Sequence, residues 1–209
     1  MKNKIFKKKF IYLISPNKIK NNRFYKQLEY LFKAKKINFF QLRLKRERKK
    51  NILIIGKKIR KICKKYKVKF IINDDPFLAK KLDSDGCHLG QKDMKIFKAK
   101  KILKNKIIGI TCHGSKKLII NAKKNKPNYI ALGSFFKSRL KPNTKKAKKS
   151  LIKWCKQKTN LPIVAIGGID NKNYKSLIKL GVNYLAISSF IWNNPRFNPK
   201  DAIKKFELK

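Results

Sequence analysis

The sequence predicts an α/β protein with one domain, folded as a (β/α)8 barrel (a TIM barrel). Three observations predict this fold: short β-type apolar segments alternate with amphipathic segments eight times, the connections are short, and no linker interrupts the 209 residues. Eight such units in about 200–250 residues are typical of this barrel, and a doubly wound open sheet is the alternative. We therefore expect one barrel domain over residues 1–209.

The first half of the chain supplies four of the eight units. The first strand is FIYLI, which ends at Ser15-Pro16, and the helix after it has Phe24, Leu28 and Leu31 at helical spacing. The strands expected here cover residues 10–14, 37–45, 68–73 and 86–89, and the helices cover 22–36, 52–66, 76–82 and 95–103.

The second half repeats the pattern. Its third strand, PIVAI, is almost continuously apolar, as expected for a parallel strand buried on both faces. The helix before that strand directs Leu151, Ile152 and Cys155 inward. The strands expected here cover residues 107–111, 129–133, 162–166 and 184–188, and the helices cover 116–124, 144–158, 173–180 and 199–206.

The chain is strongly basic, with 58 Lys and Arg residues against ten acids and a net charge of +48. Only seven of the 58 are Arg, the residue that base-edge recognition favours, and the lysines are spread along the whole chain. Lys, Asn and Ile are abundant together, as A/T-rich codons produce. This pattern favours solvated lysines over a specific nucleic-acid partner, and a basic nucleic-acid-binding barrel remains the alternative from another class.

Composition also bounds the location of the protein. Hydrophobic residues make up 42% of the chain, which is enough for a packed core, yet no apolar stretch approaches the roughly 20 residues that span a bilayer. No signal peptide is recognisable. The four cysteines are far apart, without a C-x-x-C pair, which fits a reducing cytoplasm. We expect a cytoplasmic protein without a membrane partner, and a homo-oligomer is left open.

Polar residues follow seven of the eight predicted strands. Catalytic residues of such barrels lie just after the carboxyl ends of the strands, so this placement predicts an active site there. The residues are Gln41, Arg43, Lys45, Asn73, Asp74, Asp75, His88, Gln91, Asp93, Thr111, His113, Gly133, Ser134, Gly167, Gly168, Ser188 and Ser189.

Five of the ten acids lie between positions 74 and 93. Asp74 follows the third strand and Asp93 the fourth, and neighbouring strand ends in a barrel are close enough for two carboxylates to share one hard cation. Oxygen ligands beside an open site suit Mg²⁺. The alternative is that Asp74 or Asp75 caps the helix at Pro76. We expect Asp74 to be the ligand, and Asp75 to cap the helix or to lie just behind the metal ligands. Asp83 and Asp85 are expected in a loop.

Three polar residues alternate along the second strand: Gln41, Arg43 and Lys45. Alternate residues of a strand share a face, and two inward cations at a barrel mouth need an anion. A diphosphate would accept the Arg fork and the Lys point charge, unless Lys45 leaves the mouth for solvent.

Two small-residue pairs follow the last two strands. Gly167-Gly168 permits close approach of the backbone to a ligand, and Ser188-Ser189 follows the next strand, where barrels often bind phosphate. His88 and His113 are each interpreted as hydrogen-bonded structural residues rather than catalysts. Neither a zinc cluster nor a nucleotide-binding glycine fingerprint is recognisable.

The segment IINDDPFLAKKLDSDGCHLGQKDM, residues 71–94, resembles the signature of the thiamine-phosphate synthase family. Matches to the same family, in its order and spacing, are QLRLK (41–45), IIGITCH (107–113), YIALGSFF (129–136), PIVAIGGI (162–169) and AISSFI (186–191). The resemblance covers most of the chain. It implies a barrel enzyme that joins 4-amino-5-hydroxymethyl-2-methylpyrimidine diphosphate to 4-methyl-5-(2-phosphooxyethyl)thiazole, giving thiamine phosphate and pyrophosphate.

The resemblance also implies roles for individual residues. Asp74 and Asp93 would bind Mg²⁺, and Arg43, Lys45 and Lys141 would be the catalytic cations on the leaving diphosphate. The substrate-binding residues would be Gln41, Arg43, Lys45 and Asn73 for the pyrimidine diphosphate, Thr111 where the family usually has Ser, and Gly168, Ser188, Ser189, Ser138 and Lys141.

One loop departs from the family pattern, which usually has Thr-x-Thr-Lys after the sixth strand. Here the stretch is Ser138-Arg139-Leu140-Lys141, which keeps the cation and one hydroxyl but lacks the second hydroxyl. The related thiazole tautomerase is the alternative enzyme. It isomerises its substrate without a Mg²⁺ carboxylate pair, so Asp74 and Asp93 favour the synthase.

Overall fold

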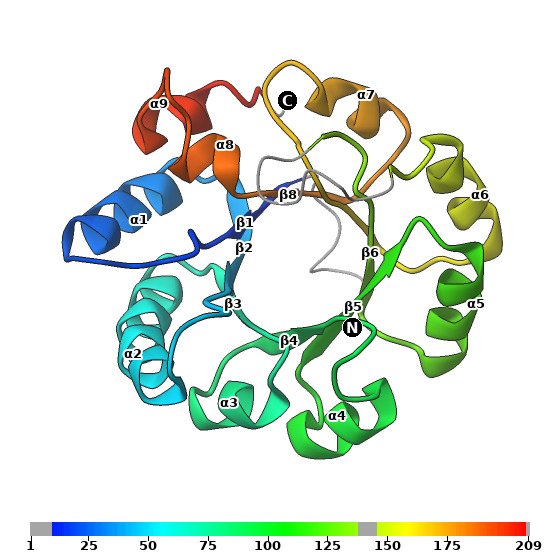
Figure 1. Ribbon diagram of the computed structural model, residues 1–209, viewed down its shortest axis with the longest axis horizontal. Coiled ribbons are helices and arrows are strands. Elements are labelled where there is room, and N and C mark those ends of the chain that lie inside the picture. The colour runs from blue at the N-terminus through cyan, green and yellow to red at the C-terminus, as the bar shows by residue number, and fades with distance from the viewer. Residues whose placement is uncertain (1–9, 138–145, 208–209) are drawn as a thin grey trace.

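The computed structural model describes residues 10–137 and 146–207. Within these ranges, eight parallel strands form one closed barrel, and the helices surround it (Figure 1), which confirms the predicted fold. The strands are β1 (Phe10–Ile14), β2 (Ile37–Leu42), β3 (Lys69–Asn73), β4 (Gly86–Leu89), β5 (Ile107–His113), β6 (Tyr129–Leu132), β7 (Ile163–Ala165) and β8 (Tyr184–Ile187). The helices are α1 (Arg23–Lys33), α2 (Lys49–Lys65), α3 (Pro76–Lys81), α4 (Ile96–Leu103), α5 (Lys116–Asn125), α6 (Ser150–Lys158), α7 (Tyr174–Lys179), α8 (Ser189–Trp192) and α9 (Pro199–Lys204).

Consecutive strands are neighbours throughout, and β8 returns to pair with β1, where Leu13 lies opposite Ile187. Along each strand the side chains alternate between two cores. In β1, Ile11 and Leu13 pack against the helices, whereas Tyr12 points into the barrel.

Aromatic rings fill the barrel interior. Phe39 stacks on Tyr12 at 5.3 Å between ring centroids and meets Tyr184 edge to face at 5.0 Å. Tyr129 completes the group, and all four rings are buried. This packed layer of side chains closes the barrel interior, so any ligand must bind above it, at the mouth of the barrel.

Several elements differ from the predicted ones, and three of these differences have a clear reason. β2 ends at Leu42 rather than at 45, because the backbone N–H of Arg43 donates to Ser15 Oγ at 2.9 Å instead of to a strand carbonyl. α6 begins at Ser150 rather than at 144, since Ala147 N–H is bonded to Ser134 O at 2.8 Å. α8 was not predicted, because four residues are too few to show a helical period.

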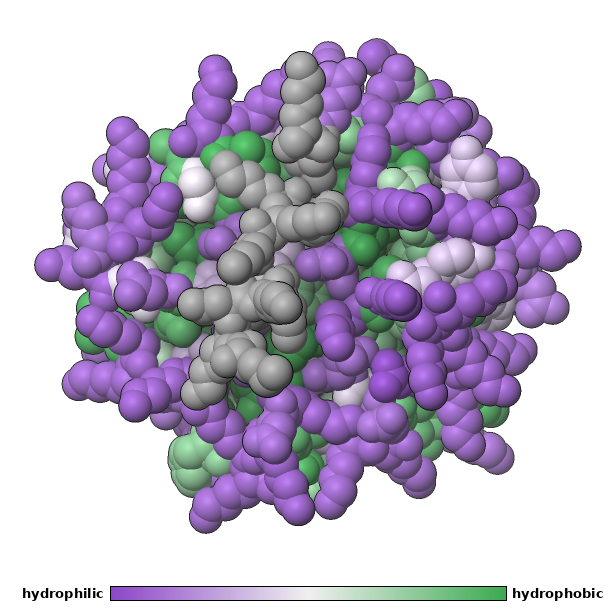
Figure 2. Space-filling view, turned by 180° about the vertical axis from the view of Figure 1, so that it is seen from behind, coloured by the Kyte–Doolittle hydropathy of each residue, from purple (hydrophilic) through white to green (hydrophobic). Residues whose placement is uncertain are grey.

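Hydrophilic side chains cover most of the face in Figure 2, with apolar residues in patches between them. No helix in the described part of the chain has the length and apolar character needed to cross a membrane. All four cysteines are buried and free.

Candidate active site

The barrel contains a cavity of about 1300 Å³, lined by strand ends and by the loops that follow them. It brings together eight of the twelve residues to which the resemblance assigns a role: Gln41, Arg43, Lys45, Asn73, Asp74, Asp93, Thr111 and Ser188. Gly168 and Ser189 are adjacent to the lining residues Gly167 and Ser188 but do not themselves line the cavity. Ser138 and Lys141 lie outside the described residues.

The cationic wall comes from the end of β2. Gln41 belongs to the strand, but Arg43 and Lys45 lie in the loop after it, so the prediction that the strand carries all three is wrong. The three still line one cavity, while Leu44 between them packs into the outer core. Burial lowers the pKa of Arg43, an effect that Asp74 opposes. No ion pair among the described residues includes Arg43, which leaves its charge available to an anion.

Two carboxylates face each other beside this wall. Asp74 follows β3 with a left-handed backbone (φ 67°), its N–H donates to His88 O at 2.8 Å, and its Oδ2 lies 3.1 Å from Lys45 Nζ. Asp93 accepts a 2.6 Å hydrogen bond from the N–H of Gly90. Burial, together with the hydrogen-bonded contact to Asp74, raises the pKa of Asp93. Such a pair is stabilised by a cation that both can share.

Asp75 caps α3, as predicted. Its side chain accepts a 3.0 Å hydrogen bond from Leu78 N, and Pro76 occupies the first turn of the helix. Lys49 Nζ lies 2.8 Å from its other oxygen. Burial acts to raise the pKa of Asp75, but these partners outweigh it and the pKa is lowered. Asp75 is therefore a structural anion beside the site.

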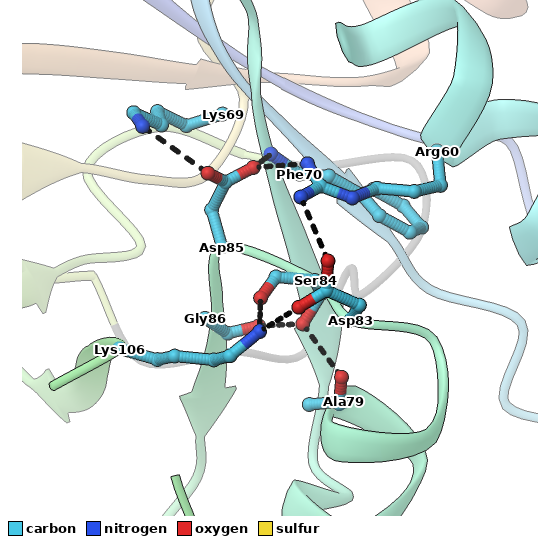
Figure 3. Close-up of polar contacts among 9 residues, drawn as sticks. All are labelled: Arg60, Lys69, Phe70, Ala79, Asp83, Ser84, Asp85, Gly86 and Lys106. Atoms are coloured by element: carbon cyan, nitrogen blue, oxygen red, sulfur yellow. Dashed lines mark hydrogen bonds and ion pairs between the residues drawn. The ribbon is translucent and has the colours of Figure 1, made fainter. Parts of the chain in front are cut away.

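The remaining two acids of the cluster lie before β4, at the opposite ends of the strands (Figure 3). Asp85 accepts hydrogen bonds from Arg60 at 2.8 Å, from Lys69 at 3.1 Å and from the backbone N–H of Phe70 at 2.9 Å. Asp83 contacts Arg60 and Lys106 but is 80% exposed, against 18% for Asp85. The acids that are close in sequence therefore lie at two ends of the barrel: Asp74 and Asp93 at the mouth, and Asp83 and Asp85 at the opposite end, where Asp85 joins α2 to β3.

We expect Asp85→Ala to lower the free energy of unfolding by about 2–3 kcal/mol, because it leaves Arg60, Lys69 and a backbone N–H without their shared acceptor. Asp83→Ala is the matched control and should cost less than about 1 kcal/mol, since its ion pairs are solvated. Urea unfolding measures both. Equal losses in the two variants would contradict the assignment.

Amide and hydroxyl groups complete the centre of the cavity. Gln41 Nε2 donates to Asn73 Oδ1 at 2.6 Å, which joins the ends of β2 and β3. His88 is hydrogen-bonded through both ring nitrogens, to Tyr129 and to Thr111, as expected of a structural histidine. Burial lowers the pKa of His88 to about 4, so the ring is neutral at physiological pH.

The ends of β7 and β8 form the other side of the mouth. Gly167 and Gly168 both have positive φ, 93° and 63°, and a Cβ at Gly168 would overlap the backbone of Phe136 and Lys137. Ser188 Oγ donates to Ser15 O at 3.1 Å, which ties β8 to the loop after β1. The backbone here is closely packed, and only glycine fits at position 168.

Sequence reasoning missed the loop between β1 and α1. Lys18 and Lys20 of this loop and Arg23 at the start of α1 line the cavity, as does Trp192 of α8. The available signal was a basic loop directly after a strand, but it carries no recognisable motif, and in a chain of this charge it does not stand out.

The fold and this cavity define a (β/α)8-barrel enzyme with a carboxylate pair and a cationic wall at its mouth. Comparison with known proteins is more specific. Residues 11–191 match the family model described as thiamine monophosphate synthase. The chain belongs to this family, and it is a transferase of thiamine biosynthesis, a thiamine-phosphate synthase.

Individual relatives agree with this assignment. The chain is 56% identical over 207 residues to the thiamine-phosphate synthase of Pelagibacter ubique, covering 99% of this chain and 100% of that protein. It is 35% identical over 188 residues to that of Erythrobacter litoralis, covering 88% of each. Among solved structures, thiamine phosphate pyrophosphorylase from Pyrococcus furiosus matches with a TM-score of 0.84 and 26% identity, over 97% of this chain and 95% of that one.

Proposed function

We propose that this enzyme joins 4-amino-5-hydroxymethyl-2-methylpyrimidine diphosphate to 4-methyl-5-(2-phosphooxyethyl)thiazole with Mg²⁺ as its cofactor. The observation that carries this proposal is the carboxylate pair Asp74 and Asp93 beside the cations Arg43 and Lys45 in one cavity. The two carboxylates would bind the metal, and the cations, with the metal, would neutralise the charge of the diphosphate.

The donor set fits Mg²⁺. Both candidate ligands are hard carboxylate oxygens, and the raised pKa of Asp93 reflects burial and a nearby carboxylate that a divalent cation would relieve. No group of three or more His, Cys, Asp or Glu side chains that could hold a metal occurs in the described ranges. The remaining ligands would therefore be water and substrate oxygens, as is common for Mg²⁺ on phosphates. When bound, the ion would neutralise charge on the diphosphate.

Arg43 and Lys45 would stabilise the leaving group. The C–O bond to the diphosphate breaks with its electron pair on oxygen, so negative charge grows there, and preorganised cations are most effective at such a position. Lys141, outside the described residues, would add a third cation. Gln41 and Asn73, already joined by a hydrogen bond, would orient the pyrimidine, and Thr111 would contact the diphosphate.

The second substrate would occupy the opposite side of the mouth. Backbone N–H groups around Gly168 and the Ser188-Ser189 pair would hold its phosphate, with Ser138 as a further hydroxyl. The thiazole nitrogen then donates its lone pair to the pyrimidine methylene carbon, so a protein nucleophile is unnecessary. The cysteines support this, since burial raises the pKa of all four thiols and keeps them protonated.

The assay of this proposal combines purified protein, both substrates and Mg²⁺. Thiamine phosphate and pyrophosphate should form in equal amounts, and removal of the metal by a chelator should stop the reaction until Mg²⁺ is restored. A thiazole tautomerase would instead isomerise its substrate without metal. An unchanged turnover rate in the presence of the chelator would contradict the magnesium assignment.

The partners of the protein would be these two small molecules, without specific nucleic acid and without a membrane, in the cytoplasm. The buried free thiols are consistent with a reducing compartment. Any attraction to nucleic acid should be nonspecific and should fade as salt approaches physiological strength.

A further inference from the structure

A line of hydrogen bonds crosses the barrel interior below the mouth and ends at Thr111. Tyr12 OH lies 2.8 Å from Tyr129 OH, Tyr129 OH lies 2.9 Å from His88 Nδ1, and His88 Nε2 lies 2.8 Å from Thr111 Oγ1. These residues come from β1, β6, β4 and β5. Tyr12, Tyr129 and His88 are buried, and Thr111 is partly exposed in the cavity.

The surrounding structure fixes two members of this line, Tyr129 and Thr111. Gly109 of β5 leaves the space that the Tyr129 ring occupies, because a Cβ there would overlap the ring. The carbonyl oxygen of Thr111 accepts a 2.5 Å hydrogen bond from Gln91 Nε2, and the strand register shifts between Thr111 and His113. An irregularity of this kind redirects a side chain at a functional site.

Counting hydrogens gives the line a direction. Each hydroxyl has one hydrogen, and a neutral imidazole has one N–H and one acceptor nitrogen. If Tyr12 donates to Tyr129 and Tyr129 donates to Nδ1, then Nε2 carries the hydrogen and donates to Thr111. The Thr111 hydroxyl hydrogen is then free to point into the cavity.

The opposite direction leaves the hydroxyl hydrogen of Tyr12, at the floor of the cavity, without a protein acceptor among the described residues. Thr111 would donate to Nε2, Nδ1–H to Tyr129, and Tyr129 to Tyr12, whose own hydrogen has no further acceptor recorded among the described residues. Unpaired buried donors are strongly disfavoured. Burial keeps the His88 ring neutral in either case. Of the two directions, only the first gives every buried group of the line a partner.

We propose that His88 is a positioning residue that holds Thr111 as a hydrogen-bond donor to a diphosphate oxygen of the substrate. Oxygens of a diphosphate only accept hydrogen bonds, so a hydroxyl that faces them contributes only if its hydrogen is free. The Tyr12–Tyr129–His88 line keeps it free. This inference rests on the proposed function, in which Thr111 contacts the diphosphate.

Nitrogen-15 NMR of histidine-labelled protein tests the direction without any need for activity. The chain has only two histidines, so His113→Gln assigns the His88 signals. We expect the Nε2–H tautomer of His88 at neutral pH in the unliganded enzyme. The Nδ1–H tautomer, or a doubly protonated ring, would overturn the proposal even if the enzyme makes thiamine phosphate.

Kinetics test whether His88 acts through Thr111. Thr111→Val should lower kcat by about 10²-fold, the loss typical of one donor to a developing oxyanion, whereas Thr111→Ser should stay near wild type. Tyr129→Phe removes the donor to Nδ1, so it should shift His88 towards the Nδ1–H tautomer and lower kcat about tenfold in the wild-type background. In the Thr111→Val background it should have no further effect on kcat.

The outcomes separate this inference from the proposed function. A merely structural role of Tyr129 would lower kcat by the same factor in both backgrounds and would leave the tautomer unchanged, which overturns the inference. If the wild-type enzyme formed no thiamine phosphate, the proposed function would fail, while the NMR result would still report the direction of the line. If Tyr129→Phe does not fold, the wild-type tautomer decides.

Discussion

Asp93→Ala is expected to lower the rate of thiamine phosphate formation by about 10²-fold or more, the loss typical of removing a group that stabilises charge in the transition state. The charges at the mouth explain why one carboxylate is not enough. Asp74 Oδ2 lies 3.1 Å from Lys45 Nζ, so this pair alone is close to neutral. Asp93 supplies a second carboxylate beside Asp74 that is not in an ion pair of the described residues, so a divalent cation can be shared between the two.

Asp93→Asn separates this charge from the shape of the loop. The Asn side-chain oxygen can still accept the hydrogen bond from Gly90 N–H that Asp93 accepts at 2.6 Å, so the loop should keep its course. Activity should nevertheless fall about as far as in Asp93→Ala, and added Mg²⁺ should restore it only in part. Initial rates over a Mg²⁺ titration measure both effects.

Asp93→Asn should lower activity but should not lower the stability of the metal-free protein. The folded-state pKa of Asp93 is raised by burial and by Asp74, so above that pKa the ionised group opposes folding, and this contribution disappears as pH falls through it. A neutral Asn removes the opposition, so the thermal midpoint of metal-free Asp93→Asn should equal or exceed that of wild type. Asp83→Asn, exposed at the far end of the barrel, is the control for activity. Wild-type turnover in Asp93→Asn would remove the metal argument.

The barrel itself could be predicted because its signal repeats. Eight apolar segments alternate with eight amphipathic ones. An error of a few residues at a boundary changes only the length of the adjoining loop and leaves the order of the elements unchanged. Hydrogen bonds between residues distant in sequence caused the main errors, as at Ser15, whose side chain accepts the N–H of Arg43 and ends β2 early. Such a bond joins residues 28 positions apart, and no local pattern announces it.

Part of the site could also be predicted from the sequence, and part could not. Asp74, Asp93, Arg43 and Lys45 could be predicted because strand ends of a barrel meet at one mouth. The line from Tyr12 to Thr111 could not, because its members lie on four strands and nothing in the sequence joins His88 and Thr111 to Tyr12 and Tyr129, which look like ordinary core residues. The ion pairs of Asp85 could not be predicted because Asp85 is near Asp74 in the sequence but far from it along the barrel axis. Asp74 follows the carboxyl end of β3, whereas Asp85 precedes the amino end of β4.

Arg43→Lys should lower kcat by about 10-fold or more, and Arg43→Gln by about 10³-fold. Both losses should arise because the leaving diphosphate is stabilised less well. The guanidinium is partly buried, and burial lowers its pKa, so the folded protein keeps a charge there at a cost. No carboxylate of the described residues pairs with it, and a diphosphate is the partner that would repay that cost.

The lysine variant is informative because the backbone at this position is held independently of the side chain. Arg43 N–H donates to Ser15 Oγ at 2.9 Å, Ser15 Oγ lies 3.3 Å from Arg43 O, and Ser15 O accepts from Ser188. Arg43→Lys therefore keeps the charge and the loop but loses the fork that binds two oxygens at once. Pyrophosphate should inhibit this variant less strongly than wild type.

Arg46→Lys is the matched control, because Arg46 also lines the cavity but is exposed at its rim. Its kcat and its inhibition by pyrophosphate should stay close to wild type. If Arg43→Lys behaved like this control, position 43 would contribute only diffuse positive charge. In a chain with a net charge of +48, diffuse charge is available from many lysines, so the specific loss at Arg43 is what distinguishes a built diphosphate site from general attraction.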